Sequence, residues 1–338
     1  MSTTSQYTSF SDLYLGLEQA VRVTTGITAT ENLAKRAINV ALQDMHLGME
    51  YRYPWAERRA VLRTQDDYST GTITATQGST AVTGASTLWK TANSFAIDNV
   101  RTTGKILIGG GTTPYGISSV TNDTAAVLTD RFVETTVSAG TYVYYEDEYD
   151  LATDFLRPVD AQRFSDEVNI DIISRTEFRR RYPTNTTSGR PTVATILDFA
   201  PSGNTTPIRR VKFSPAPDSF ILIPYTYITS NLVVDSTGTA KTGFTADSDE
   251  PIVPLRYRHA ILFHALYNWY RDRKDDDRAI AAKAEYTDIM MRIMSDSEIG
   301  AVRPQIRPRI SGYVRAAKSP YSGGSGRFDI NGKFDRMG

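Results

Sequence analysis

The sequence has no cysteine, only three histidines and no long apolar run. Without cysteine the chain cannot form disulfides, thiolate metal sites or a cysteine nucleophile. Three histidines (His46, His259 and His264) are too few for us to expect metal binding or Ser-His-Asp catalysis. Apolar stretches such as residues 220–224 are far too short to cross a bilayer, and the first ten residues lack the pattern of a signal peptide. We therefore expect no contact with a membrane.

An excess of charge is also absent. Lys and Arg total 38 and Asp and Glu total 38, so the net charge is zero. Attraction of the whole chain to nucleic acid is therefore not indicated, and local asymmetries of charge carry more information. The length of 338 residues is sufficient for two or three domains.

Helical periodicity is present at two places far apart in the sequence. Thr28 and Glu31 have capping-box spacing, and apolar residues recur every fourth position, which predicts a helix that ends before Pro54. Residues 254–294 predict two helices joined by a charged turn, an antiparallel hairpin. Neither segment can bury its apolar face alone, so we expect the two to pair. The expected core of this bundle is Leu33, Ala37, Ala41, Met45, Ile261, Ala265, Trp269, Ile289 and Ile293.

The region between these helices has the pattern of strands and turns. Small apolar and hydroxyl residues alternate around Gln77-Gly78, which predicts a hairpin over residues 71–84. Further short strands over residues 105–145 predict a small barrel or sandwich. Residues 192–199, 208–213 and 220–228 predict a three-stranded meander.

The predicted fold class is α+β: a discontinuous helical bundle with a large β-rich insertion and an extended C-terminal arm. Its predicted divisions are an N-terminal helical half (1–64), a β-barrel or sandwich (65–150), a second β-rich segment (151–250), a helical hairpin that completes the bundle (251–300) and a basic arm (301–338).

Motifs that would carry chemistry are weak. The triple glycine from Gly109 to Gly111 lacks the Gly-Lys-Ser/Thr ending of a P-loop, so we interpret it as a hairpin turn. We interpret Glu146 to Glu148 as a solvated edge or an inter-subunit ion pair, and the acids at 247–250 as a solvated loop. Arg179 to Arg181 fit an exposed helix face. We expect no enzymatic activity, no cofactor and no metal.

The C-terminal segment stands apart by its charge. From residue 301 onward eight basic residues face two acidic ones, a net charge of plus six. Prolines block regular helix there, and residues 322–326 are a flexible Ser/Gly stretch. A purely solvated tail would gain nothing from spaced aromatic residues, so we expect an arm that folds onto a partner with an acidic groove, or, as a second choice, onto DNA. The residues expected to dock are Arg303, Arg307, Arg309, Tyr313, Arg315, Lys318, Tyr321, Arg327, Phe328, Lys333 and Phe334.

Two stretches resemble the head-to-tail adaptor (connector) proteins of tailed bacteriophages. The first joins Tyr53-Pro-Trp55 to residues 58–64 and to the Thr/Gly hairpin that ends at Trp89. The second runs from Ile223-Pro-Tyr-Thr-Tyr227 through an acidic loop to residues 251–257 and the following helices. Together they cover most of residues 30–297, and their joint order is more specific than either motif.

The resemblance implies a structural virion protein of the neck, assembled in the host cytoplasm. It also implies a homo-oligomeric ring, usually of twelve copies, that docks on the portal through its C-terminal arm and joins a downstream tail or nozzle protein. Genomic DNA would pass through the central channel with transient, non-specific contact. The alternative is a receptor- or glycan-binding virion protein that uses the β-rich region. A tail-associated glycan hydrolase is a third possibility, for which no carboxylate pair can be named.

Overall fold

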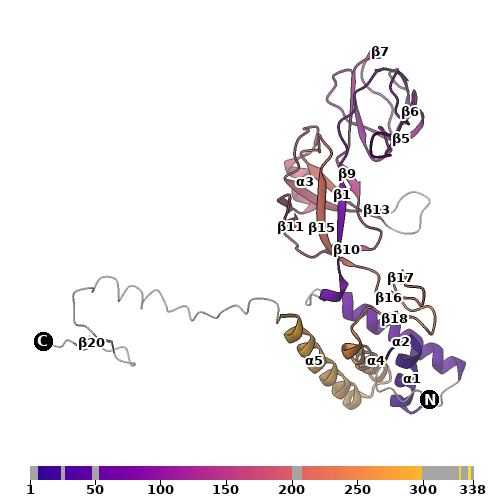
Figure 1. Cartoon of the computed structure of the whole chain (residues 1–338), viewed down its shortest axis with the longest axis vertical. Coiled ribbons are helices and arrows are strands. Elements are labelled where there is room, and N and C mark those ends of the chain that lie inside the picture. The colour runs from indigo at the N-terminus through magenta and orange to yellow at the C-terminus, as the bar shows by residue number, and fades with distance from the viewer. Residues whose placement is uncertain are drawn as a thin grey trace. The chain divides into compact units, whose positions relative to one another are not determined.

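The computed structural model of the chain describes residues 7–23, 27–47, 53–199 and 208–298, with two short strands at 327–328 and 334–335. The chain forms two compact units, residues 1–265 and residues 266–338. Within the described residues, five α-helices and many short strands give the α+β class that the sequence predicts, with a large β-rich region between helical segments (Figure 1). None of the described helices is long and apolar enough to cross a membrane.

The first unit begins with two helices that pack together, α1 (Phe10–Val21) and α2 (Thr28–Leu47). Ser9 caps α1 in a capping box with Asp12, which satisfies backbone N–H groups of the first turn. Leu13 and Leu17 of α1 are fully buried. The buried residues of α2 are Ala34, Ile38, Ala41, Leu42, Met45 and His46.

The apolar face of α2 is rotated from the predicted one. Leu33 is 53% exposed and Ala37 is half-buried, so placing Leu33 in the bundle core was wrong. Four residues cover about 400° of an α-helix, which is about 40° more than a full turn. Side chains at every fourth position from Leu33 onward therefore do not share one face but move gradually around the helix. The drift reaches the buried side only at Ala41 and Met45, which are buried as predicted.

A curled seven-stranded sheet forms the first β module of this unit. All of its pairings are antiparallel, in the order β7-β2-β3-β6-β5-β4-β8. The hairpins predicted at 71–84 and around the triple glycine are both confirmed, as β2–β3 and β4–β5. Inside the curl, Trp89 donates to the hydroxyl of Tyr142 at 3.0 Å, and both rings are buried. The strands are β2 (Thr72–Ala75), β3 (Ala81–Ala85), β4 (Lys105–Ile108), β5 (Tyr115–Asn122), β6 (Ala125–Leu128), β7 (Val137–Gly140) and β8 (Tyr142–Tyr145).

A second β module, here called the middle module, consists of a three-stranded and a five-stranded sheet that share one apolar core. The three-stranded order is β1-β15-β10, with β1 (Glu57–Arg63), β15 (Leu222–Thr229) and β10 (Phe155–Pro158). The five-stranded order is β11-β12-β13-β14-β9, with β11 (Arg163–Ser165), β12 (Ile170–Ile172), β13 (Val193–Phe199), β14 (Ile208–Ser214) and β9 (Glu148–Asp150). Helix α3 (Arg175–Arg181) follows β12, and the 3-10 helix η1 (Pro54–Ala56) precedes β1.

The predicted three-stranded meander is only half correct. β13 and β14 form the expected hairpin, but β15 leaves that sheet and pairs with β1 over seven residues, from Arg63↔Leu222 to Glu57↔Ile228. The other edge of β14 is taken by β9. Local alternation identifies a strand but not its partner, and β1 lies more than 150 residues before β15 in the sequence.

The chain returns to α1 and α2 through short strands and a 3-10 helix before α4 (His259–Asp272) begins. The ring of Phe244 stacks on Phe10 at 4.4 Å, and the side-chain oxygen of Asn39 accepts from the backbone of Phe244 at 2.8 Å. The elements of this return are β16 (Val233–Val234), β17 (Ala240–Lys241), β18 (Glu250–Pro251) and η2 (Leu255–Tyr257).

The second unit contains the end of α4 and helix α5 (Asp276–Glu298). Tyr267 and Tyr270 of α4 lie under Lys283 and Arg278 of α5, at 5.7 and 5.8 Å, as expected of an antiparallel hairpin. Trp269, Ile289 and Ile293 of this unit are buried. Ile261 and Ala265, which belong to the first unit, are buried as well. In the predicted arm, β19 (Arg327–Phe328) pairs with β20 (Phe334–Asp335), and the remaining arm residues lie outside the described part of the chain.

Candidate functional site

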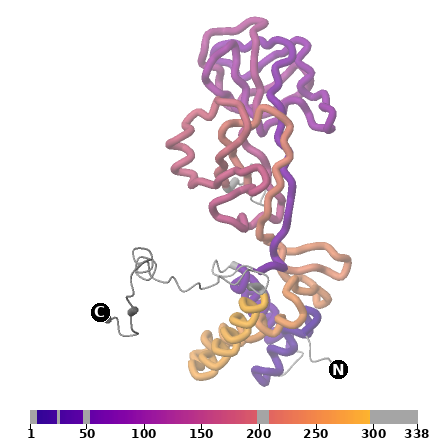
Figure 2. The backbone as a smooth tube through the Cα atoms, turned by 60° about the vertical axis from the view of Figure 1, so that its left-hand side comes forward, coloured from indigo at the N-terminus to yellow at the C-terminus, as the bar shows by residue number. Residues whose placement is uncertain are grey.

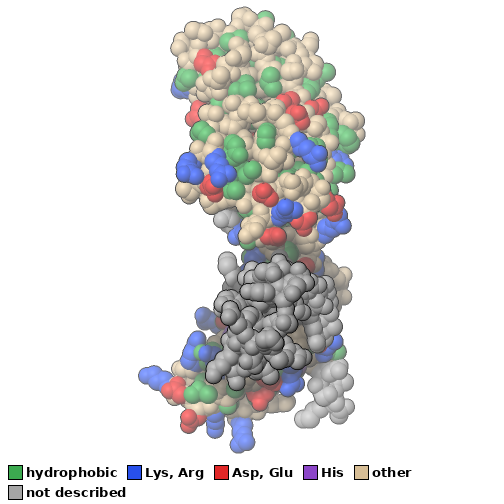
Figure 3. All heavy atoms as spheres, turned by 90° about the vertical axis from the view of Figure 1, so that its left-hand side faces the viewer, with side chains coloured by type: hydrophobic (Ala, Val, Ile, Leu, Met, Phe, Trp, Pro, Cys, Tyr) green, Lys and Arg blue, Asp and Glu red, His purple; other side chains and the backbone are tan. Residues whose placement is uncertain are grey.

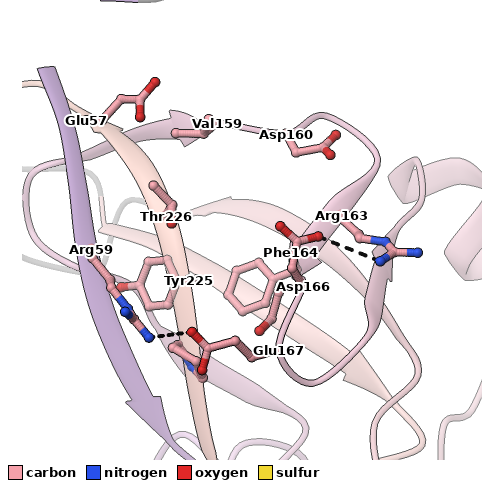
Figure 4. Close-up of a pocket in the computed structure, with 12 residues that line it drawn as sticks. Glu57, Arg59, Val159, Asp160, Arg163, Phe164, Asp166, Glu167, Tyr225 and Thr226 are labelled. Atoms are coloured by element: carbon pink, nitrogen blue, oxygen red, sulfur yellow. Dashed lines mark hydrogen bonds and ion pairs between the residues drawn. The ribbon is translucent and has the colours of Figure 1, made fainter. Parts of the chain in front are cut away.

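A surface pocket of about 400 Å³ opens on the middle module beside β15 (Figure 4). The pairing of β10 with β15 ends at Pro158↔Tyr227, and the pocket begins at this point. The residues that follow β10, together with strand β11, line the side of the pocket opposite β1. Its lining includes residues of β1, β15 and β11 together with the turn that follows β11. The pocket therefore depends on segments from three distant parts of the sequence.

The pocket has an aromatic floor and a charged rim. The rings of Phe164 and Tyr225 stack at 5.1 Å and are nearly fully buried. Across the opening, Arg59 forms an ion pair with Glu167, as Figure 4 shows. Four acids and two arginines line the pocket, a net charge of minus two. Such a site can hold a basic or apolar side chain of a partner.

Charged side chains of both signs are interspersed over the middle module. On the face in Figure 3, the seven-stranded module shows mainly uncharged atoms, whereas blue and red side chains gather over the middle module. Arg179 to Arg181 are exposed on α3, as predicted, and Arg181 pairs with Glu177 at 2.5 Å. This surface is suited to contacts with other proteins through matched charges.

The acidic run at Glu146 to Glu148 is a buried ion cluster, and its interpretation as a solvated edge or an inter-subunit pair was wrong. Glu146 and Asp147 are 1% and 0% exposed. Arg101 binds the Glu146 carboxylate through two nitrogens, at 2.9 and 2.5 Å. Asp147 accepts from Lys105 at 2.7 Å and lies 3.2 Å from the Lys212 Nζ. Lys105 belongs to the seven-stranded sheet and Lys212 to the five-stranded sheet, so Asp147 joins the two modules.

The cations around Asp147 decide its charge. Burial alone would raise the pKa of this carboxyl, but Lys105 and Lys212 outweigh burial and hold the pKa below its ordinary value of 3.8. Asn185 adds a hydrogen bond at 3.1 Å. The carboxylate is therefore charged at neutral pH and its negative charge is matched on several sides.

The loop before β18 is likewise more ordered than predicted. Asp249 is fully buried and accepts hydrogen bonds from the backbone N–H groups of Thr245 and Ala246, at 2.7 and 2.8 Å. Lys241 lies 3.2 Å from its carboxylate. Asp247, which is exposed, pairs with Lys35 of α2 at 2.8 Å. Asp249 thus holds the loop through bonds to its own backbone, and Asp247 connects the loop to α2. The expectation of a solvated loop was therefore wrong for Asp249.

His46 is a buried structural histidine beside the start of the middle module. Its Nδ1 donates to the carbonyl of Leu42 at 2.9 Å, and its Nε2 accepts from the indole N–H of Trp55 at 3.2 Å. The second bond requires the neutral imidazole, because a protonated Nε2 cannot accept a hydrogen bond. Burial accordingly lowers the pKa of His46 from 6.5 to about 4.

We expect acidification to destabilise the protein through His46. The unfolded chain binds a proton near pH 6.5 and the folded chain only near pH 4, so stability is full above pH 6.5 and falls between these values. The loss should reach about 3 kcal/mol, measured by urea unfolding at stepped pH. In His46→Phe the free energy of unfolding should change little between pH 6.5 and pH 4, whereas His259→Gln should still show the loss that His46 causes. An unchanged profile in His46→Phe would show that other groups cause the loss.

The structure brings together residues that the sequence did not single out. Arg59, Phe164 and Tyr225 meet at the pocket, and Lys105 and Lys212 meet at Asp147. One signal was available: carboxylates bracketed by tyrosines over residues 144–149 suggest burial more than solvation. Among the residues that the structure describes, no cluster of three or more His, Asp or Glu side chains is arranged to hold a metal.

The comparisons with known proteins give one family. The model of the SU10 adaptor protein family matches residues 117–309, more than half of the chain, from β5 through α5. A comparison with curated proteins finds no match. The matched segment includes strands β9 to β15 of the middle module and the helical hairpin, whereas β1 and Lys105 precede it. The chain therefore belongs to the SU10 adaptor protein family, the structural adaptors of bacteriophage virions.

Proposed function

We propose that the protein forms a ring, of twelve copies as in similar adaptors, that docks on the portal and links the capsid vertex to the tail. DNA passes through the central channel of this ring, and a downstream tail or nozzle protein binds its other side. The observation that carries the proposal is the family match over residues 117–309. The balanced charge supports it, because copies with a net charge of zero can approach without strong repulsion.

The basic arm, residues 301–338, is the proposed portal-docking element. Its net charge of plus six contrasts with the neutrality of the whole chain. The docking residues proposed from the sequence lie there, among them Arg303, Arg307 and Tyr313. An arm of this composition binds by folding onto a partner, with charge for approach and aromatic side chains as anchors.

Deletion of residues 301–338 should abolish portal docking and leave the rest folded. The test is native mass measurement and negative-stain imaging of the purified protein mixed with portal. A full-length variant with the eight basic residues of the arm changed to glutamine separates the effect of charge from that of the aromatic anchors, and we expect it to dock at least about tenfold more weakly. Unchanged portal binding by the deletion variant would refute the docking role of the arm. A full-length protein without affinity for portal would refute the adaptor ring.

One observation favours the alternative of a receptor- or glycan-binding virion protein. The pocket combines an aromatic floor with a polar rim, as small-ligand sites do. Binding of the full chain to a glycan array, lost on Glu167→Ala at the rim, would support this alternative. We favour the adaptor because the family match includes the helical hairpin, which a glycan receptor does not require.

A further inference from the structure

A second pocket of the middle module lies between α3 and the five-stranded sheet. It has a volume of about 240 Å³, and helix α3 packs against β13 beside it. It shares no lining residue with the pocket beside β15. That first pocket is lined in part by β1 and β15, which run side by side in Figures 1 and 2. We call the second one the α3 pocket, and its lining includes Arg175, Phe178, Arg179, Tyr182, Leu197 and Lys212.

The α3 pocket carries positive charge. Three cations and one acid line it, a net charge of plus two: Arg175, Arg179, Lys212 and Glu148. The Nζ of Lys212 lies 3.0 Å from Glu148 and 3.2 Å from Asp147, so the charge of this lysine is matched. Within the described residues, neither Arg175 nor Arg179 has a carboxylate at ion-pair distance. Two guanidinium groups with unmatched charge therefore line one small space.

Helix α3 fixes the positions of these two arginines. The hydroxyl of Ser174 caps the helix by accepting from the backbone N–H of Glu177 at 3.2 Å. Phe178 is 2% exposed and anchors the helix on the module. Arg175 and Arg179 are four residues apart, so they lie on the same side of the helix. An anchored helix that presents both groups to one pocket lowers the entropy that binding of a ligand costs.

The chemistry of the lining selects the class of ligand. A guanidinium group presents paired N–H donors in one plane, which match the oxygens of a carboxylate or a phosphate. The lining also includes Phe178, Tyr182 and Leu197, so an anion on an apolar stem fits better than a bare one. Duplex DNA is bound through rows of cations that contact about 6–10 phosphates. Only two unpaired cations line this pocket, so a carboxylate of a protein side chain is the favoured ligand.

We propose that the α3 pocket is a docking site for an acidic segment of another virion protein. A Glu or Asp side chain of that segment places its carboxylate between Arg175 and Arg179, and its methylene groups contact Tyr182 and Leu197. The inference rests on the proposed adaptor function. It adds to the basic arm a second contact, which lies on the middle module and is built from described residues.

A fluorescein-labelled hexaglutamate peptide, titrated against the full chain and followed by fluorescence anisotropy, tests the site. Wild type should bind the peptide. The double variant Arg175→Gln and Arg179→Gln should bind it at least about tenfold more weakly, because it loses the charged hydrogen bonds to the carboxylate. The matched control is Arg180→Gln with Arg190→Gln. Both of these arginines are exposed and neither lines the pocket, so the control loses the same charge and should bind as wild type.

Three results would overturn the inference: no binding of the peptide by wild type, equal weakening in both double variants, or tighter binding of a duplex of about 30 base pairs that depends on Arg175 and Arg179. The second result would show attraction to positive charge in general, and the third would assign the site to nucleic acid. Melting curves that match wild type establish that the variants fold.

Ring formation on portal tests the proposed function separately. A wild type that forms the ring but does not bind the peptide overturns this inference alone. A wild type that binds the peptide as expected but forms no ring overturns the proposed function and leaves the carboxylate site supported.

Discussion

Replacement of Asp147 by alanine is expected to lower the free energy of unfolding by about 3–5 kcal/mol, because removing one partner of a buried charge cluster leaves the others uncompensated. Lys105 and Lys212 would lose the carboxylate that lies 2.7 and 3.2 Å from their nitrogens. Their side chains are only about one-fifth exposed, so water can replace little of this interaction. The backbone would keep its hydrogen bond from Phe213 N–H to the Asp147 carbonyl, at 2.8 Å.

The position of Asp147 predicts a second effect, the loss of cooperativity between the two β modules. Trp89 is buried in the seven-stranded module, and with Trp55 and Trp269 changed to phenylalanine it alone reports unfolding by tryptophan fluorescence, while circular dichroism follows the whole chain. In wild type the two urea transitions of the β modules should coincide. In Asp147→Ala the urea transition followed by Trp89 fluorescence should no longer coincide with the transition followed by circular dichroism, because no carboxylate then connects Lys105 of β4 with Lys212 of β14.

The matched control is Asp150→Ala in the same segment. Asp150 pairs with Arg210 at 2.5 Å, but its side chain is 48% exposed, and such surface pairs contribute about 0–1 kcal/mol. The pH dependence provides a further check. Since Lys105 and Lys212 hold the pKa of Asp147 below 3.8, its contribution is present above that pH and is lost as the pH falls through the folded-state value. Equal losses for Asp147→Ala and Asp150→Ala would mean that the buried cluster does not stabilise the fold.

The sequence was sufficient for features that local pattern decides. The β2–β3 hairpin follows from alternation around Gln77-Gly78, and the two helices predicted over residues 254–294 are present as α4 and α5. In both cases neighbours within a few residues determine the conformation. The class of the fold follows too, because helical and strand periodicities occupy separate stretches.

Features that depend on distant partners could not be predicted in the same way. The pairing of β15 with β1, rather than with β14, joins segments that no local rule relates. The acids at 146–148 are hydrophilic by composition, and only the arrival of Lys105 from one sheet and Lys212 from another makes their burial favourable. The pocket was missed for the same reason, since Phe164 and Tyr225 meet only in the folded middle module.

Trp269→Ala is expected to destabilise the protein by about 3–5 kcal/mol, the range for truncating a large buried aromatic side chain. Trp269 is 8% exposed in the second unit, and Arg273 lies over its ring at 4.4 Å. Its indole N–H has no hydrogen-bond partner within the described residues, so the ring contributes through packing. Trp269→Phe, which keeps most of the apolar surface, should therefore cost much less than Trp269→Ala.

The control for Trp269 is Ile280→Ala on α5, because Ile280 is 68% exposed and should change stability by less than about 0.5 kcal/mol. Urea unfolding followed by circular dichroism measures all three variants. If Trp269→Phe proved as costly as Trp269→Ala, the indole nitrogen would carry a specific interaction. A near-zero effect of Trp269→Ala would mean that burial of this face does not stabilise the helical hairpin. The expected order, alanine far more damaging than phenylalanine, would instead establish Trp269 as the packing centre of the segment that precedes the arm.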